Sequence, residues 1–214
     1  MELSESTARE FSVVVVGNMN PAIHHPMWYI GEVPEFAAEA EASLSGNSIL
    51  TAPNFAKFAT QNITVECQMN RWLIAASSSE KFELALHVAQ ETFRRLYETP
   101  VTAFGFNFDF RGPVGKASSA LRELSSTLAF AEGFQVDTLS FRSPARAFEE
   151  PDGTSLMRAV TARLADADRD EAVVRVNVHY TVAAGSGKFD LSALMGRASA
   201  DASEAEFHVP KFLE

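Results

Sequence analysis

The chain has 214 residues, of which 46% are hydrophobic and 21% are charged, and these values exclude a disordered chain. Its 28 Asp and Glu outnumber its 18 Lys and Arg, and the formal charge of −10 argues against nucleic-acid binding and against attraction to anionic membranes. At this length we expect a single domain of residues 1–214, or else two intimately packed halves at about 1–112 and 113–214.

The first quarter to third of the chain is predicted to contain strands and a short helix. The run 11–17 is continuous and β-branched, which is typical of a strand buried on both faces. Residues 35–46 fit a short helix. Residues 62–69 alternate between apolar and polar side chains, and 71–77 follows after one asparagine, so these two segments predict a tight β-hairpin.

The clearest helix is predicted over residues 79–98, where apolar side chains recur at steps of three and four and form one buried stripe. Ser77 and Glu80 have the S-x-x-E spacing of a capping box. On the opposite side of the helix, His87 lies one turn after Glu83, and we expect these two to pair at the surface. The stripe consists of Phe82, Leu86, Ala89, Phe93 and Leu96.

The clearest strand is predicted over residues 101–110. Every second residue there is phenylalanine, so Phe104, Phe106, Phe108 and Phe110 share one face. A helix is predicted over 116–131, with a strand over 134–141 after it.

The last part of the chain is predicted to form a long hairpin followed by a helix. Residues 154–164 fit either a helical face or a strand. We favour the strand because the segment leads into residues 172–182, whose alternating pattern clearly predicts a strand. A final helix is expected near Asp190. Clustered strands followed by helices predict the α+β class, with a largely antiparallel sheet and helices packed on one face. Two stretches, 62–98 and 154–200, share this order, which raises a pseudo-duplication of a strand-hairpin-helix unit.

No stretch of the sequence carries a complete catalytic, nucleotide or metal motif. Gly187-Lys188 lacks the first Walker glycine and the following Ser or Thr, and Gly115-Lys116 fails on spacing. The histidines lack metal-ligand spacing. Cys67 alternates with apolar residues, so we expect an inert core thiol. We therefore predict no catalytic residue, no metal and no cofactor, and we favour a non-enzyme over an enzyme.

The most unusual stretch is residues 13–33, in which four valines and a glycine are followed by two asparagines, two prolines, adjacent histidines and a Trp-Tyr pair. In one interpretation the prolines fix a crossing loop, Trp28 and Ile30 fill the core, and His24 and His25 face water. In another the aromatic residues form a contact surface, because Trp and Tyr contribute large area with one polar atom. In a third, a histidine acts as an acid-base group beside Tyr29. The interface candidates are His24, His25, Met27, Trp28 and Tyr29.

A second candidate surface follows from strand alternation. If 62–69, 101–110 and 172–182 lie in one sheet, the face opposite the phenylalanines is polar. A plain water-facing surface, a protein interface and a curved sheet that cradles a polar ligand all fit this pattern. The ligand-face candidates are Asn107, Asp109, Arg175, Asn177 and His179, with Glu66 and Gln68 on the same face.

These observations predict a non-catalytic subunit of a cytoplasmic complex that binds another protein or self-assembles as a homo-oligomer. The cytoplasm is expected because residues 1–10 have no secretory signal, no apolar run reaches the roughly 20 residues of a membrane helix, and the lone cysteine suits a reducing compartment. The acidic charge favours a protein partner with a basic patch. The alternative is a small polar ligand-binding protein or an enzyme. It would use His179, Arg175 and Asp109 on the sheet face, or the His24/His25 loop.

Overall fold

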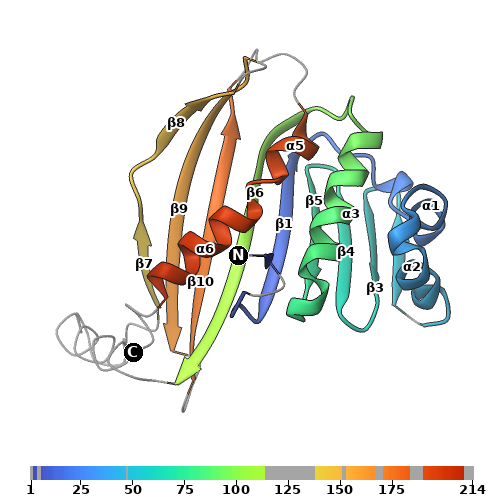
Figure 1. Cartoon of the computed structure of the whole chain (residues 1–214). Coiled ribbons are helices and arrows are strands. Elements are labelled where there is room, and N and C mark those ends of the chain that lie inside the picture. Colours follow the sequence, from blue (N-terminus) through green and yellow to red (C-terminus); the bar gives the residue numbers. More distant parts are fainter. Residues whose placement is uncertain are drawn as a thin grey trace, which may run out of the picture.

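The computed structural model describes residues 2–3, 6–46, 48–113, 138–150, 153–166, 171–183 and 190–209. Within them, ten strands form one antiparallel sheet (Figure 1). The strands are β1 (Glu10–Gly17), β2 (Ile49–Ala52), β3 (Phe55–Ala59), β4 (Ile63–Gln68), β5 (Arg71–Ala76), β6 (Val101–Pro113), β7 (Thr138–Arg142), β8 (Arg146–Glu149), β9 (Ser155–Asp166) and β10 (Glu171–Val182). Their order across the sheet is β2-β3-β4-β5-β1-β6-β10-β9-β7, and β8 also pairs with β9.

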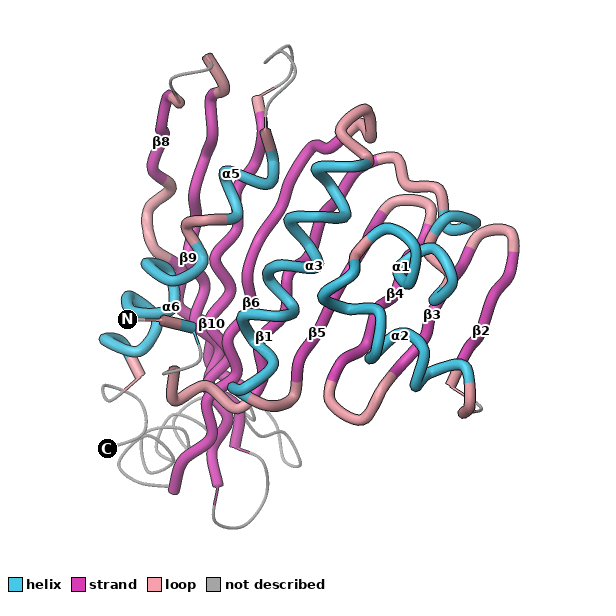
Figure 2. Tube along the Cα trace, turned by 45° about the vertical axis from the view of Figure 1, so that its right-hand side comes forward, coloured by secondary structure: helices cyan, strands magenta, loops and turns pink. Residues whose placement is uncertain are grey.

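The described helices all lie on one side of this sheet (Figure 1, Figure 2). They are α1 (Pro26–Glu32), α2 (Ala37–Leu44), α3 (Phe82–Arg95), α5 (Leu191–Met195) and α6 (Ala198–His208), with single 3-10 turns η2 (Pro21–Ile23), η3 (Pro34–Phe36) and η4 (Ser79–Lys81). The predicted α+β class, with a largely antiparallel sheet and helices on one face, is confirmed. In the described part of the chain, no helix has the length and apolar character needed to cross a membrane.

Buried and half-exposed side chains alternate along the strands, so the sheet has one buried face and one more exposed face. In β1, Phe11, Val13 and Val15 are buried beneath the helices, whereas Ser12 and Val14 are half-exposed on the other side. The prediction that this strand is buried on both faces is therefore wrong, because the described helices cover only one face. The four phenylalanines of β6 are buried as predicted, and each contributes about 1.5–3 kcal/mol by leaving water.

The helix predicted over 79–98 is shorter in the structure and begins differently. Its first turn is the 3-10 turn η4, and α3 ends at Arg95. The capping box predicted for Ser77 and Glu80 does not form, since Ser78 stands at the N-cap of η4 without a side-chain bond. The predicted stripe is otherwise confirmed: Phe82, Leu86, Ala89 and Phe93 are buried.

His87 lies near a surface carboxylate, but the predicted partner Glu83 is wrong. Its Nε2 lies 3.2 Å from Glu35 Oε2, a contact across elements that is close enough for an ion pair when the imidazole is protonated, although it is not aligned as a hydrogen bond. Glu83 instead accepts a hydrogen bond from the backbone N–H of Leu3 at 2.7 Å. Tertiary contacts thus replace the local pair expected one turn apart on the helix.

The hairpins are confirmed. β4 pairs with β5, and β9 pairs with β10 over the segments predicted at 154–164 and 172–182. The final helix begins after Asp190, whose carboxylate accepts from Ala193 N–H at 3.1 Å, and it is split into α5 and α6. The pseudo-duplication is not confirmed, because β4 and β5 lead into one long helix whereas β9 and β10 lead into two short ones.

Some predictions lie outside the described residues. These are the helix over 116–131, both Gly-Lys pairs, and the first part of the strand over 134–141, of which the structure describes β7. Conversely, the sequence patterns missed β2, β3, β8 and α1, all of them short elements.

The C-terminal helix α6 is held against the sheet by a buried polar cluster. Arg158 of β9 donates to Asp201 at 2.9 Å and to Glu204 at 2.6 Å, and the Tyr180 hydroxyl of β10 bonds to Asp201 at 2.8 Å. Arg158, Tyr180 and Asp201 are buried. Burial raises the pKa of Asp201 even though both partners favour its charged form. Each of these buried polar groups therefore depends on the others for its hydrogen bonds.

Candidate functional site

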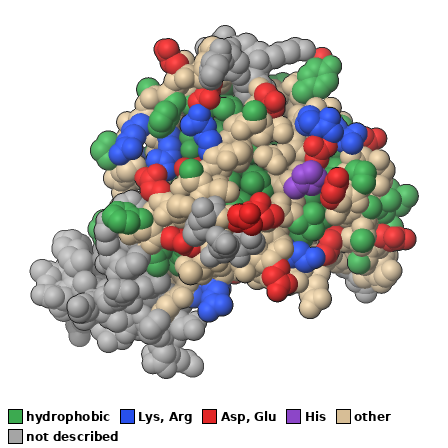
Figure 3. Space-filling model, in the orientation of Figure 1, with side chains coloured by type: hydrophobic (Ala, Val, Ile, Leu, Met, Phe, Trp, Pro, Cys, Tyr) green, Lys and Arg blue, Asp and Glu red, His purple; other side chains and the backbone are tan. Residues whose placement is uncertain are grey.

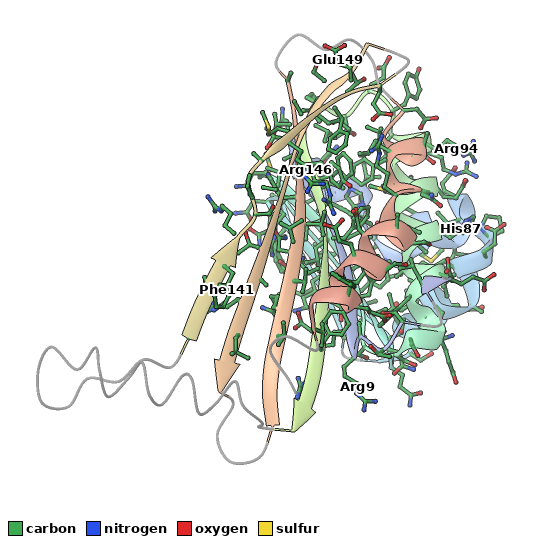
Figure 4. All side chains as sticks on the ribbon, turned by 60° about the vertical axis from the view of Figure 1, so that its left-hand side comes forward. Arg9, His87, Arg94, Phe141, Arg146 and Glu149 are labelled. Carbon is green, nitrogen blue, oxygen red and sulfur yellow. The ribbon has the colours of Figure 1, made fainter. Side chains whose placement is uncertain are left out.

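We call the side of the sheet opposite the helices the open face. It is built from alternate residues, such as Ser12 of β1 and Leu73 of β5, and no described helix lies over it. Figure 4 turns the sheet toward its β7–β8 side, with α3 and α6 lying on the other side of the strands. All five ligand-face candidates lie on the open face: Asn107 and Asp109 on β6, and Arg175, Asn177 and His179 on β10.

Two of these candidates form the strongest contact on the open face. Arg175 lies directly opposite Asp109 and donates two hydrogen bonds to its carboxylate. The bond from Nε to Oδ1 is 2.7 Å long. Asp109 is buried by this contact, while Arg175 remains largely exposed and its pKa is raised, chiefly by the bond to Asp109. The pair therefore presents a guanidinium, not a carboxylate, to a partner.

Polar amides form the neighbouring row. Asn177 Nδ2 donates to Asn107 Oδ1 at 2.8 Å, and Asn107 Nδ2 donates to Ser12 Oγ at 3.0 Å. The row crosses three strands because β6 lies between β1 and β10. The strand order thus brings together Ser12 and two candidates that the sequence could only assign to one face.

An arginine without an acidic partner among the described residues lies beside the Arg175–Asp109 contact. Arg163 of β9 is directly opposite Arg175, and its only described hydrogen bond is a 3.4 Å contact to Thr138. Like charges opposite each other on neighbouring strands destabilise a sheet, but Asp109 compensates the charge of Arg175, so the uncompensated charge at this position is that of Arg163. Sequence reasoning missed Arg163, although the odd-numbered residues of 154–164 already carried the alternation that places it.

Among the side chains that the structure describes, basic ones exceed acidic ones on the open face, in contrast to the composition of the chain as a whole. Figure 3, which looks onto the opposite, helix-covered side, shows acidic and basic side chains mixed there. Among the described residues, the open face carries Lys57, Arg71, Arg111, Arg142, Arg163 and Arg175 against Glu10, Glu66, Asp109 and Glu149.

A shallow trough of about 280 Å³ runs along this face at its β5–β1–β6 centre. Its floor includes the apolar side chains Val14, Leu73 and Ala75. Arg71, which donates to Glu66 at 2.8 Å, lies at one end, and Arg175 also lines it. Glu10 and Asp109 line it too, so the trough joins an apolar floor to edges that carry both arginines and carboxylates.

His179 does not join Arg175 and Asp109 in a reacting group. It sits opposite Gly105 on one side and Ala159 on the other, and Asn177 separates it along the strand from Arg175. A Cβ at Gly105 would meet the Val178 carbonyl oxygen at 2.5 Å, so this position needs glycine for the close approach of β6 and β10. Partial burial lowers the pKa of His179.

The interface candidates of the loop agree with the core-packing interpretation for Trp28 and differ from it for His24. Tyr29 is fully buried and His24 is only 2% exposed, so the expectation that His24 faces water is wrong. Trp28 and Ile30 pack against the core as partly buried side chains. His25 accepts from Met27 N–H at 3.2 Å and caps α1, and Met27 is 58% exposed. Of the five, Met27 is the most exposed.

A hydrogen-bonded chain explains why His24 and Tyr29 are buried. Trp72 Nε1 donates to the Tyr29 hydroxyl at 3.1 Å, and that hydroxyl bonds to His24 Nδ1 at 2.9 Å. Burial lowers the pKa of His24 to about 4 and raises that of Tyr29. Both groups are thus neutral at pH 7. His24 also lines an open pocket of about 400 Å³ between residues 18–24 and the end of α3.

Two observations on the described side chains bear on metal and thiol chemistry. Among them, no cluster of three or more His, Cys, Asp or Glu could hold a metal ion. Cys67 is buried as predicted, and burial raises its pKa to about 12, which suppresses the thiolate. A scan against protein-family models and a search of curated proteins find no match for this chain.

Proposed function

We propose that this protein is a non-catalytic binding subunit whose open face receives an acidic surface of another protein. The observation that carries this proposal is the position of Arg163 opposite Arg175: Asp109 compensates the charge of Arg175, whereas Arg163 has no acidic partner among the described residues and a partner's carboxylate supplies one. Arg142 extends the same basic region onto β7. The basic-patch partner expected from overall charge is thus replaced by an acidic one.

A protein fits this face better than a polyanion or a small molecule. The overall charge of −10 opposes the approach of nucleic acid, whose charge acts over its whole length, whereas a protein can present a local acidic patch. The trough, at about 280 Å³, falls just below the roughly 300–1,000 Å³ typical of small-molecule sites. A cytoplasmic location remains part of the proposal, supported by the lone buried cysteine.

Reversing two exposed charges tests the proposal. R142E/R163E changes side chains that pair with no described acidic group, so the fold should survive. The tagged wild-type chain should retain a protein from its source cells. The purified partner should then bind the double variant about tenfold more weakly by calorimetry, because attraction at two positions becomes repulsion.

The matched control is R146E, an exposed arginine of the neighbouring strand β8 whose side chain points to the helix side (Figure 4). It should bind like the wild type. Equal weakening by R146E, or full binding by R142E/R163E, contradicts the proposed face. The alternative, small polar ligand binding, is supported instead if native mass spectrometry finds a retained metabolite that His24→Gln or Asn107→Ala releases.

A further inference from the structure

Strand β2 forms one edge of the sheet and pairs only with β3 within the described residues (Figure 2). The two-residue turn Pro53-Asn54 makes Ala52 and Phe55 the closing pair of this hairpin, and such a pair exchanges its backbone hydrogen bonds. Since hydrogen-bonded and non-bonded pairs alternate along an antiparallel ladder, the N–H and C=O of Ile49 and Thr51 point away from β3. Within the described residues, these backbone groups have no strand partner and are free to hydrogen-bond to another strand.

The edge at β2 lacks the protection found at the opposite edge. β7 and β8 carry Arg142, Arg146 and Glu149, and Pro144 interrupts the edge between them. Charges, proline and interruptions are the devices that keep sheet edges from pairing with other chains. Residues 49–52 hold no ionisable side chain. The contrast indicates an edge that is kept free to pair.

One exposed leucine lies on this edge strand, and another precedes it closely in the sequence. Leu50 of β2 points to the open face and is 59% exposed, and Leu44, the last residue of α2 on the helix side, is 39% exposed. Only residues 45–48 separate α2 from β2. Leu50 on the open face and the half-buried Ile49 on the helix side are thus the apolar side chains of the unpaired strand itself, and they lose water contact if another strand is added.

We propose that a second copy of this chain pairs with β2, antiparallel, about a twofold axis normal to the sheet near Leu50 and Thr51. Such an axis keeps open face beside open face and helices beside helices, because paired residues in a ladder point to the same side. Two chains that each carry a charge of −10 repel each other, so two copies can pair only through a segment without net charge. Residues 49–54 are such a segment. The two open faces then form one continuous surface.

The edge is short, so the dimer is expected to be reversible. Four paired residues with flanking leucines bury less than the ~1,200 Å² of a standard interface, and interfaces of that size are transient. We therefore expect monomer and dimer to exchange between about 1 and 100 μM.

Two substitutions at the edge test this proposal by sedimentation velocity over that concentration range. Leu50→Lys places a charge on the strip, and Thr51→Pro removes an outward-pointing donor without touching the β2–β3 ladder. Each should raise the dimer dissociation constant by more than about tenfold. Thr51→Val, which keeps the N–H, should dimerise like the wild type. Circular dichroism and thermal melts verify that each variant is folded.

The control away from the edge is Met157→Lys, which changes an exposed apolar side chain of β9 on the open face. It should leave dimerisation intact. A wild-type chain that is monomeric throughout, or a dimer that survives both edge variants, overturns the proposal, and so does isotope-edited cross-linking that joins β2 only to a different protein. R142E/R163E should still dimerise, so failure of the edge proposal and failure of the open-face proposal are distinguishable.

Discussion

His24 is a polar side chain whose burial is made possible by two aromatic neighbours. The chain of bonds from Trp72 through Tyr29 to His24 satisfies donors that would otherwise cost about 1–3 kcal/mol each when buried. Because Trp72 can only donate, the Tyr29 oxygen must accept, and its own hydrogen can then bond to a neutral imidazole. Protonation of His24 replaces that acceptor with a donor and breaks the chain.

The stability of the protein should therefore fall on acidification through His24. Its pKa drops from 6.5 to about 4 on folding, so the unfolded chain binds the proton first and the free energy of unfolding declines between these values as pH falls. The full loss is about 3 kcal/mol. Urea denaturation at a series of pH values should show this slope in the wild type and lose much of it in His24→Gln. His25→Asn, which keeps the N-cap acceptor of α1, should retain the slope.

At the scale of elements, helix α6 is attached to the sheet by charge as well as by apolar packing. Ala198, Ala202 and Ala205 are its buried apolar residues, and they bring little hydrophobic area. The cluster of Arg158, Tyr180 and Asp201 lies beneath the same helix. We therefore expect polar contacts to contribute more to the position of α6 than to the position of α3.

Removing Asp201 should loosen α6 before the rest of the fold. Asp201→Ala leaves the buried Arg158 guanidinium with Glu204 alone, and breaking a buried pair from one side costs about 3–5 kcal/mol. Hydrogen exchange should show loss of protection in α6 while β6 and β10 keep theirs. Ser203→Ala, an exposed change on the same helix, should alter the free energy of unfolding by no more than about 0.5 kcal/mol. Uniform loss of protection would contradict a local attachment.

At the scale of the whole molecule, charge differs from one described region of the surface to another. The chain is acidic overall, its open face has more basic than acidic side chains among the described residues, and the β2 edge is uncharged. The two proposed interactions therefore differ in physical origin. Partner binding depends on charge, and self-pairing depends on backbone hydrogen bonds and apolar contact.

Salt should separate these two interactions. Raising ionic strength from about 0.1 to 1 M shortens the screening length from roughly 10 to 3 Å. Partner affinity should fall severalfold over this range, while the dimer dissociation constant should stay constant or decrease, because screening weakens repulsion between the two acidic chains. Calorimetry and sedimentation at both salt levels measure the two effects. Salt-insensitive partner binding would argue against the basic open face.

Several features could be predicted from the sequence because they depend on local periodicity. The four phenylalanines of β6, the alternation of Val174 with Arg175, and the apolar stripe of α3 each follow from which way successive side chains point along one element. The sequence therefore determined the α+β class, the buried face, and the membership of Asn107, Asp109, Arg175, Asn177 and His179 on the opposite face.

Only the tertiary structure decided what these elements meet. The order β5-β1-β6-β10 brings Ser12, Asn107 and Asn177 into one row and sets Arg163 opposite Arg175, and strand order is a long-range choice that no period encodes. β2 is too short to show a period, so its position at the edge could not be read from residues 49–52. The prediction that His24 faces water was wrong because its burial depends on a long-range contact. Trp72 is distant in the sequence and is brought close to His24 only by folding.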